Sequence, residues 1–273
     1  MPELPEVETV VRQLRNSKIE NRTIVDVKID WLPIIKPFSY KEFSASICNE
    51  KIVKILRHGK WIIFLLSNKK FIFIHLRMSG NFSRTKSKYD RAELLLSDGK
   101  RLFFRDTRKF GRWVYTKNPD LILNKLGPDA ISENFSFEYF YNILRKKNRM
   151  IKPFLLDQSF IAGIGNIYAD EALWLAKIHP KRNTNTLNKK NIKKLFNAII
   201  EVLNIGIKNN GTSLGKGKSN FKGYNGESGE AQDEVNAYGR HGKECYRCRS
   251  IMNKIYVAQR GTTICPGCQK FTN

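Results

Sequence analysis

The sequence lacks any apolar run long enough to span a bilayer, which takes about 20 residues. Its longest run, Trp61–Leu66, is only strand-sized, and its acidic N-terminus lacks the apolar core of a signal peptide. Acidic residues are also few, because 25 Asp and Glu stand against 49 Lys and Arg, for a formal net charge of +24. These absences predict a cytoplasmic protein without a membrane anchor. The positive charge predicts a polyanionic partner, nucleic acid first and an acidic membrane surface second.

Cysteine is almost absent from most of the chain, where Cys48 stands alone and is expected to be an ordinary buried thiol. The other four form two C-x2-C pairs separated by 16 residues: Cys245 and Cys248, then Cys265 and Cys268. Each pair can point two thiolates at one ion, so the spacing predicts a zinc ribbon with one structural Zn²⁺. The alternative is two disulfides, which a reducing cytosol disfavours.

The length of 273 residues predicts about two domains. The first part of the chain, residues 23–115, is rich in Ile, Val and Phe and is divided by turn signals, which is typical of short strands. Seven strands at this spacing predict a β-sandwich or barrel-like domain. The strands are expected at Thr23–Ile29, Lys51–Leu56, Trp61–Leu66, Phe71–Leu76, Ala92–Leu96, Leu102–Phe104 and Trp113–Tyr115.

The pattern becomes helical after residue 128, with an apolar stripe between Ile192 and Leu203 that has lysines opposite. The segment 163–168, Gly-Ile-Gly-Asn-Ile-Tyr, precedes a further helix that is expected to run to about Ile178. Its free backbone N–H groups could hold a phosphate, although glycines between helices often serve only packing. Residues 209–243 are rich in glycine and are expected to form a linker or a functional lid.

The first residues, MPELPEVETVV, combine a reactive group with a helix start. Removal of Met1 would leave Pro2 as the N-terminus, a secondary amine that can attack an aldehyde-like carbon and form a Schiff base. Glu3, Glu6 and Glu8 follow, and apolar residues at positions 7, 10, 11 and 14 predict an amphipathic helix. The plainer interpretation is that these glutamates only complement the helix dipole.

Eight sequence blocks, in the same order along the chain, match the motifs of a known protein family. They are MPELPEVET at the start, HGKW around Lys60, HLRMSG at 75–80, DTRKFG at 106–111, IKPFLLD at 151–157, GIGNIYADE at 163–171, YGRHG at 238–242, and the cysteine ribbon with QRGTT. In these blocks the chain resembles the formamidopyrimidine-DNA glycosylase family over nearly its whole length. The residues Leu4–Val7 favour this family over the related endonuclease VIII group.

The resemblance implies an α+β fold in three parts. Residues 1–128 would form a catalytic β-sandwich domain with a flanking helix. Residues 129–236 would form a helix–two-turn–helix DNA-binding domain with a glycine-rich lesion loop. Residues 237–273 would form the zinc-ribbon hairpin, with Gln259–Gly261 expected at its tip.

The resemblance also implies a bifunctional DNA glycosylase and AP lyase that removes oxidised purines during base excision repair. Pro2 would attack C1′ of a flipped nucleotide, and Glu3 would be the catalytic carboxylate. Lys60 matches the lysine credited with proton donation and phosphate contact during elimination. Arg260 matches the ribbon arginine that grips phosphate during β,δ-elimination. Glu6 would have a structural role or would relay protons.

Double-stranded damaged DNA is the implied partner of a monomeric enzyme. Met78, Arg108 and Phe110 match the three residues that fill the void left by the flipped base. The expected backbone contacts come from Arg91, Lys109, Asn148, Lys152 and Asn166.

Three departures from the family pattern are visible. Arg91 stands where a histidine is usual, Asn148 aligns with a usual lysine, and residues 215–230 differ from the usual lesion loop. The departures in the loop make 8-oxoguanine preference the least certain implication. Two alternatives remain open: an endonuclease VIII-like enzyme for oxidised pyrimidines and a non-catalytic binder of damaged DNA.

Overall fold

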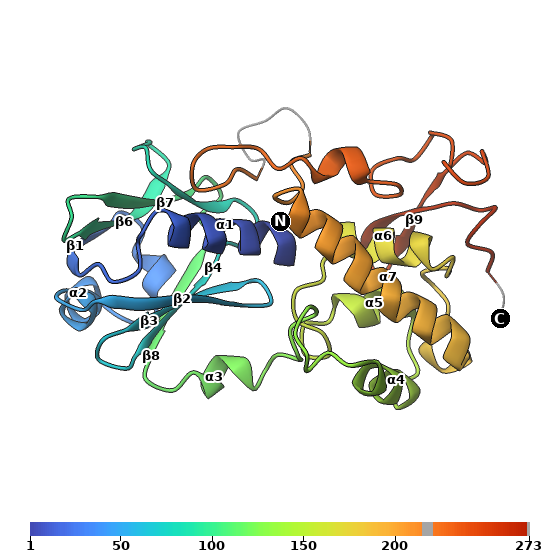
Figure 1. The fold of residues 1–273 in the computed structure, drawn as a ribbon, viewed down its shortest axis with the longest axis horizontal. Helices are drawn as coiled ribbons and strands as arrows, with labels where there is room; N and C mark the ends of the chain where they lie inside the picture. The colour runs from blue at the N-terminus through green and yellow to red at the C-terminus, as the bar shows by residue number, and fades with distance from the viewer. Residues whose placement is uncertain (215–220, 272–273) are drawn as a thin grey trace. The chain divides into compact units, whose positions relative to one another are not determined.

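The computed structural model describes residues 1–214 and 221–271, and it divides the chain into two compact units (Figure 1). The first unit combines Met1–Leu123 with Ile207–Gln232, and the second combines Asn124–Gly206 with Asp233–Asn273. The division after Leu123 lies near the predicted boundary at residue 128. The three-part division remains a prediction. In the two-unit division, the described residues 207–214 and 221–232 group with the first unit.

Two four-stranded antiparallel sheets build the first unit. One sheet has the order β1-β6-β7-β5 and the other the order β2-β3-β4-β8. Isoleucine, leucine and phenylalanine side chains from both sheets form one buried core, so the predicted sandwich is confirmed. The strands are β1 Ile24–Ile29, β2 Ile52–His58, β3 Trp61–Leu66, β4 Phe71–His75, β5 Gly80–Ser83, β6 Asp90–Leu96, β7 Arg101–Asp106 and β8 Arg112–Thr116.

Three α-helices accompany the sheets: α1 Leu4–Asn16, α2 Tyr40–Ile47 and α3 Asp120–Leu123, with a short 3₁₀ helix at Leu32–Ile35. Helix α1 begins at the N-terminus, as predicted, and Glu3 is its N-cap residue. The side chain of Glu6 accepts a hydrogen bond from the backbone N–H of Glu3, which completes a capping box. The predicted apolar stripe of α1 is fully buried in the core of the unit.

The second unit is helical and ends in a hairpin. Its helices are α4 Phe137–Arg145, α5 Ile151–Leu156, α6 Asn166–Leu175 and α7 Lys189–Lys208, the last of which runs into the first unit. Short 3₁₀ helices lie at Thr184–Thr186 and Ala231–Glu234. Strands β9 Asn253–Val257 and β10 Arg260–Ile264 form the hairpin. In the described part of the chain, no helix has the length and apolarity needed to cross a membrane.

A buried carboxylate on α6 fixes the chain that leads to the hairpin. Glu171 accepts hydrogen bonds from the backbone N–H groups of Asn236, Ala237 and Tyr238. Burial raises the pKa of Glu171, while these three hydrogen bonds act in the opposite direction. The GIGNIYADE and YGRHG blocks are therefore joined directly in the fold.

Candidate functional site

The candidate nucleophile lies at the start of α1, in a part of the first unit that is tightly packed. Pro2 is buried and Glu3 is only 2 % exposed. Glu6 connects this stretch to a distant segment, because its second carboxylate oxygen accepts from the backbone N–H of Thr212 at 2.7 Å. Gly211 has a φ of +81°, and a Cβ there would lie 2.8 Å from the Cγ of Glu6. Only glycine therefore fits beside this carboxylate.

Lys60 is the second residue of the tight turn between β2 and β3 and is 5 % exposed. The turn is anchored by Arg57, which donates to the carbonyl of Gly59 at 3.1 Å and to the carboxylate of Glu8 at 2.8 Å. Burial raises the pKa of Glu8, but the hydrogen bonds and charges of Arg57 and Arg12 together outweigh it and leave that pKa below its usual value. Through Glu8, helix α1 is thus fixed to the turn that carries Lys60.

His75, at the end of β4, is a residue that the sequence analysis did not single out. It pairs across the sheet with Trp61, next to Lys60, and the two rings meet edge to face at 4.8 Å. Its Nδ1 accepts a hydrogen bond from the backbone N–H of Arg77. Burial first, and then the charges of Arg77 and Lys60, lower the pKa of His75 to about 3. The imidazole is therefore neutral, and its place in the HLRMSG block was the signal that could have revealed it.

The three predicted void-filling residues lie on two loops of the first unit. Met78 is 40 % exposed in the loop between β4 and β5. Arg108 and Phe110 occupy the loop between β7 and β8, where Phe110 is 53 % exposed and the guanidinium lies 4.9 Å from the phenyl centroid. These exposed apolar and planar side chains are of the kind that can enter a base stack.

Two other predicted DNA contacts lie nearby in the chain but differ in their surroundings. Lys109 is exposed, and its ammonium lies 4.4 Å from the ring centroid of Trp31. Arg91, in β6, donates from Nε to the backbone carbonyl of Asp106 at 3.0 Å and is half-buried. Its guanidinium therefore already holds part of the fold in this structure.

The predicted hairpin arginine, Arg260, is exposed and begins β10. The tip of the hairpin is one residue earlier than expected, at Ala258 and Gln259, because both residues have positive φ angles of 46° and 61°. Two such residues are what a two-residue hairpin turn requires. Arg260 pairs with Val257 in the first rung of the ladder.

Lys152 is fully buried in the second unit. Its ammonium donates to Asp170 at 2.5 Å, to Thr262 at 2.7 Å and to the carbonyl of Gly261 at 3.2 Å. Burial raises the pKa of Asp170 to about 6, although Lys152 and a backbone N–H act in the opposite direction. This geometry gives Lys152 a structural role beside Arg260, in contrast to the predicted contact with the DNA backbone.

Asn166 supports the same carbonyl, because its side-chain amide donates to Gly261 at 3.1 Å. It is the first residue of α6, after Gly163, which has a φ of 115°, and Gly165, which is the N-cap residue. The predicted glycine turn before a helix is therefore present. Asn148 lies apart from this cluster, exposed in the loop between α4 and α5.

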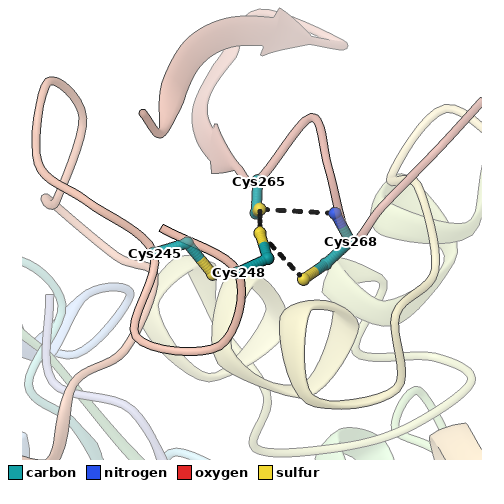
Figure 2. A group of neighbouring side chains, drawn as sticks. All are labelled: Cys245, Cys248, Cys265 and Cys268. Atoms are coloured by element: carbon teal, nitrogen blue, oxygen red, sulfur yellow. Dashed lines mark hydrogen bonds between the residues drawn. The ribbon is translucent and has the colours of Figure 1, made fainter. Parts of the chain in front are cut away.

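Four thiols converge beside the hairpin, as Figure 2 shows. The Sγ atoms of Cys245, Cys248, Cys265 and Cys268 all lie within 4.8 Å of one another. All five cysteines of the chain are free thiols, so the alternative of two disulfides is wrong. Cys265 is buried with its thiol among the others, and burial is the main cause that raises its pKa. Within residues 1–214 and 221–271 the cluster contains these four sulfur donors alone, which suits a closed, structural zinc site.

The predicted lesion loop, 215–230, is described only from residue 221 onward; residues 215–220 lie outside the described residues. The described part is attached to α1. Gln13 accepts from the backbone N–H of Tyr224 and donates to Glu227 at 3.1 Å. Tyr224 itself is buried in the core of the first unit.

Two antiparallel sheets, a helical unit and a hairpin beside four clustered cysteines define a protein of mixed α+β class with a site that fits a structural zinc ion. Two family models match the chain: the formamidopyrimidine-DNA glycosylase N-terminal domain over residues 1–113, and the formamidopyrimidine-DNA glycosylase H2TH domain over residues 126–217. The formamidopyrimidine-DNA glycosylase of Protochlamydia amoebophila is 41 % identical over 99 % of this chain and 100 % of its own length.

Solved structures give the same result. The MutM (Fpg) protein of Thermus thermophilus is 34 % identical and superposes with a TM-score of 0.91. The match covers 100 % of this chain and 100 % of the Thermus chain. A mutant of the Lactococcus lactis protein, solved in complex with DNA containing Fapy-dG, is 35 % identical with a TM-score of 0.90 over 99 % of this chain and 100 % of its own. The chain belongs to the formamidopyrimidine-DNA glycosylase family, which are DNA glycosylases of base excision repair.

Proposed function

We propose that this protein removes oxidised purines, 8-oxoguanine and formamidopyrimidines, from double-stranded DNA and then cuts the strand as an AP lyase. The observation that carries the proposal is the Pro2–Glu3 pair directly before α1, in a chain of this family. The Lactococcus lactis relative bound to Fapy-dG DNA supports the choice of a purine lesion. The formal net charge of +24 supports a DNA partner.

Pro2 would be the nucleophile once Met1 is removed. Its secondary amine forms a bond to C1′ of the damaged nucleotide, and the glycosidic bond breaks, with its electron pair leaving on the base, which gains a proton. Glu3 would protonate the ring oxygen O4′ as the C1′–O4′ bond opens. The product is a cationic iminium between Pro2 and C1′, an acceptor for the electrons of the next step.

Strand cleavage would follow from the iminium. It acidifies the C2′ protons, so loss of one proton to a general base expels the 3′ phosphate by β-elimination. A second proton loss expels the 5′ phosphate by δ-elimination, and hydrolysis releases the sugar fragment from Pro2. Lys60 and Arg260 would bind the phosphates whose departure these steps require, since fixed cations stabilise the developing negative charge.

DNA handling would be divided among the remaining predicted residues. Met78, Arg108 and Phe110 would fill the space of the extruded nucleotide, whose extrusion costs a few kcal/mol. Lys109, Asn148 and Arg91 would contact the backbone. Lys152 and Asn166 would act through the carbonyl of Gly261, next to Arg260, rather than by direct charge on the DNA.

Zinc would be held by Cys245, Cys248, Cys265 and Cys268 and would supply no chemistry to the reaction. A tetrahedral thiolate site is saturated by its four protein ligands and leaves no position for a substrate. Its role would be to fix the hairpin on which Arg260 lies, so its contribution is to folding.

Borohydride trapping on an 8-oxoguanine duplex tests the proposal. The reductant converts the iminium to a stable amine, and we expect a covalent adduct that maps to the peptide beginning with Pro2. Pro2→Gly should lower the trapping rate by roughly tenfold or more, since it replaces the secondary amine. Pro5→Gly, a proline of the same helix turn, is the matched control and should trap at nearly the wild-type rate.

Three results would count against this function. An absent adduct, or one unchanged by Pro2→Gly, removes the Schiff-base mechanism. Faster cleavage of thymine glycol than of 8-oxoguanine or formamidopyrimidine assigns the enzyme to oxidised pyrimidines. Tight binding of abasic DNA without adduct or cleavage identifies a non-catalytic binder.

A further inference from the structure

The carboxylate of Asp106 joins the two loops that carry the exposed side chains Met78, Arg108 and Phe110. Asp106 ends β7 and is 1 % exposed. Its Oδ1 accepts from the hydroxyl of Ser79, the residue after Met78, and from the backbone N–H of Arg108 at 3.2 Å. Its Oδ2 accepts from the backbone N–H of Gly111, the residue after Phe110, at 2.6 Å.

The same junction is supported from its other sides. The hydroxyl of Ser79 also accepts from the backbone N–H of Arg108 at 3.1 Å, so the two loops touch directly. A Cβ on Gly111 would lie 2.7 Å from the ring of Phe104 and 3.1 Å from Oδ2 of Asp106, which leaves room only for glycine. Arg91, which replaces the usual histidine, donates to the backbone carbonyl of Asp106.

The donors are the main chain of Arg108 itself, the hydroxyl of Ser79 next to Met78, and the main chain of Gly111 next to Phe110. None involves the exposed side chains themselves, which leaves those free to meet DNA. The hydrogen bonds are removed from water, because Asp106 is 1 % exposed. A buried carboxylate that accepts from both loops fixes their spacing before any ligand arrives.

We infer that Asp106 is a positioning residue that holds Met78 and the Arg108–Phe110 pair in register for insertion into the DNA stack. Arg91 extends this role by fixing the main chain of Asp106, so in this protein it serves the void-filling loops. The inference rests on the proposed function, because it assumes that these three side chains enter the duplex.

Asp106→Asn is the test, since the amide keeps the shape but has only one acceptor oxygen for donors that approach from two sides. Asp98→Asn is the matched control: Asp98 accepts from Lys100 in the turn between β6 and β7, on the same sheet. Each full-length protein is bound to a duplex carrying an uncleavable tetrahydrofuran abasic analogue with 2-aminopurine opposite it. The fluorescence of 2-aminopurine rises when the opposite base loses its stacking partners.

Cleavage is measured beside binding, on an 8-oxoguanine duplex and on a single strand with a preformed abasic site. We expect Asp106→Asn to lose most of the fluorescence rise and to cleave the duplex about tenfold or more slowly. It should cleave the single strand within about threefold of wild type, because no stack has to be filled there. Asp98→Asn should match wild type in all three measurements.

A full fluorescence rise for Asp106→Asn would overturn the inference, as would an equal loss on both cleavage substrates. If Asp106→Asn does not fold, Ser79→Ala decides, since it removes one link between the loops and keeps the carboxylate. Ser79→Ala should give a smaller fluorescence rise than wild type and should still cleave the single strand. A fluorescence rise equal to that of wild type would contradict the inference. Inactivity of the wild type on both cleavage substrates would refute the proposed function, whereas the fluorescence comparison would still decide the role of Asp106.

Discussion

At the scale of single residues, the buried histidine beside Lys60 sets a pH dependence of stability. The pKa of His75 is lowered from 6.5 to about 3, mainly by burial. The unfolded chain therefore binds a proton that the folded chain does not, so stability is fully present above pH 6.5 and is lost as the pH falls. At about 1.4 kcal/mol per pH unit, the loss between pH 6.5 and pH 5 is about 2 kcal/mol.

His75→Asn measures this contribution, because the asparagine oxygen can still accept from Arg77 but does not titrate. Urea unfolding gives the free energy of unfolding at pH 7 and at pH 5. The fall in this free energy between the two pH values should be about 2 kcal/mol smaller for the variant than for wild type. His241→Asn, at an exposed position, should behave as wild type. An unchanged pH difference in His75→Asn would show that the imidazole is charged in the folded protein.

Residue types were easier to predict than their surroundings. The cysteine spacing identified the four thiols that converge, because ligand spacing is a local property of the chain. The resemblance implies a DNA contact for Lys152, but it does not reveal the ion pair with Asp170 and the hydrogen bond to Thr262, because both partners lie far along the chain. The same applies to Asp106, whose role depends on donors from two loops. Burial of a charged group is decided by distant residues, and local patterns do not encode it.

At the scale of elements, the start of helix α1 packs against Gly211, about 200 residues further along the chain. Gly211 and Gly226 both have positive φ, so alanine at either position costs about 1 kcal/mol. At Gly211 the added Cβ also meets Glu6, whereas nothing lies within 4 Å at Gly226. Crowding of this kind typically adds 1–3 kcal/mol.

Gly211→Ala should therefore be less stable than Gly226→Ala by about 1–3 kcal/mol in denaturant unfolding. It should also lose activity, since displacing Glu6 disturbs its hydrogen bond to Glu3 beside Pro2. Gly99→Ala, at a positive-φ glycine in the turn between β6 and β7 with nothing within 4 Å, should retain near wild-type lesion cleavage. If Gly211→Ala matches Gly226→Ala in stability and Gly99→Ala in activity, Glu6 moves without consequence.

The strands were predicted well where alternating apolar residues are dense, and β3 has the bounds that the sequence predicts. Strand β5, Gly80–Ser83, was missed because its residues favour turns and its pairing with β7 alone makes it a strand. Helix α2 is short and was also missed, although Ser39 and Glu42 form a capping box at its start. The hairpin tip was misplaced because Ala258 and Gln259 are poor turn residues.

At the scale of the whole molecule, the two compact units have separate cores, so we expect two unfolding transitions. The zinc cysteines belong to the second unit, where Cys245 and Cys265 pack with Trp174. Loss of the metal should therefore act on one transition only. Since 1 kcal/mol shifts the midpoint of a unit of this size by about 4 °C, the shift should be roughly 10 °C or more.

Cys248→Ser, with calorimetry and zinc determination, tests this expectation. It should lower the zinc content well below one ion per chain. It should also lower the midpoint temperature of the second unit's unfolding transition and leave the midpoint of the first unit's transition unchanged. Cys48→Ser is the control, because this thiol belongs to the first unit and lies outside the cluster. Retention of stoichiometric zinc by Cys248→Ser would contradict the four-thiolate site.

The first unit is built from two separate stretches of chain, and this has a consequence for its synthesis. Its core includes Tyr224, and Glu6 finds its partner at Thr212, both beyond the helices of the second unit. At 5–20 residues per second, a ribosome takes roughly 5–20 s to pass from residue 123 to residue 232. During that interval the nascent chain carries an incomplete first unit while the second is being made. The N-terminal part of the molecule is thus the first to be translated, but its unit can complete its core only after residue 232 has been made.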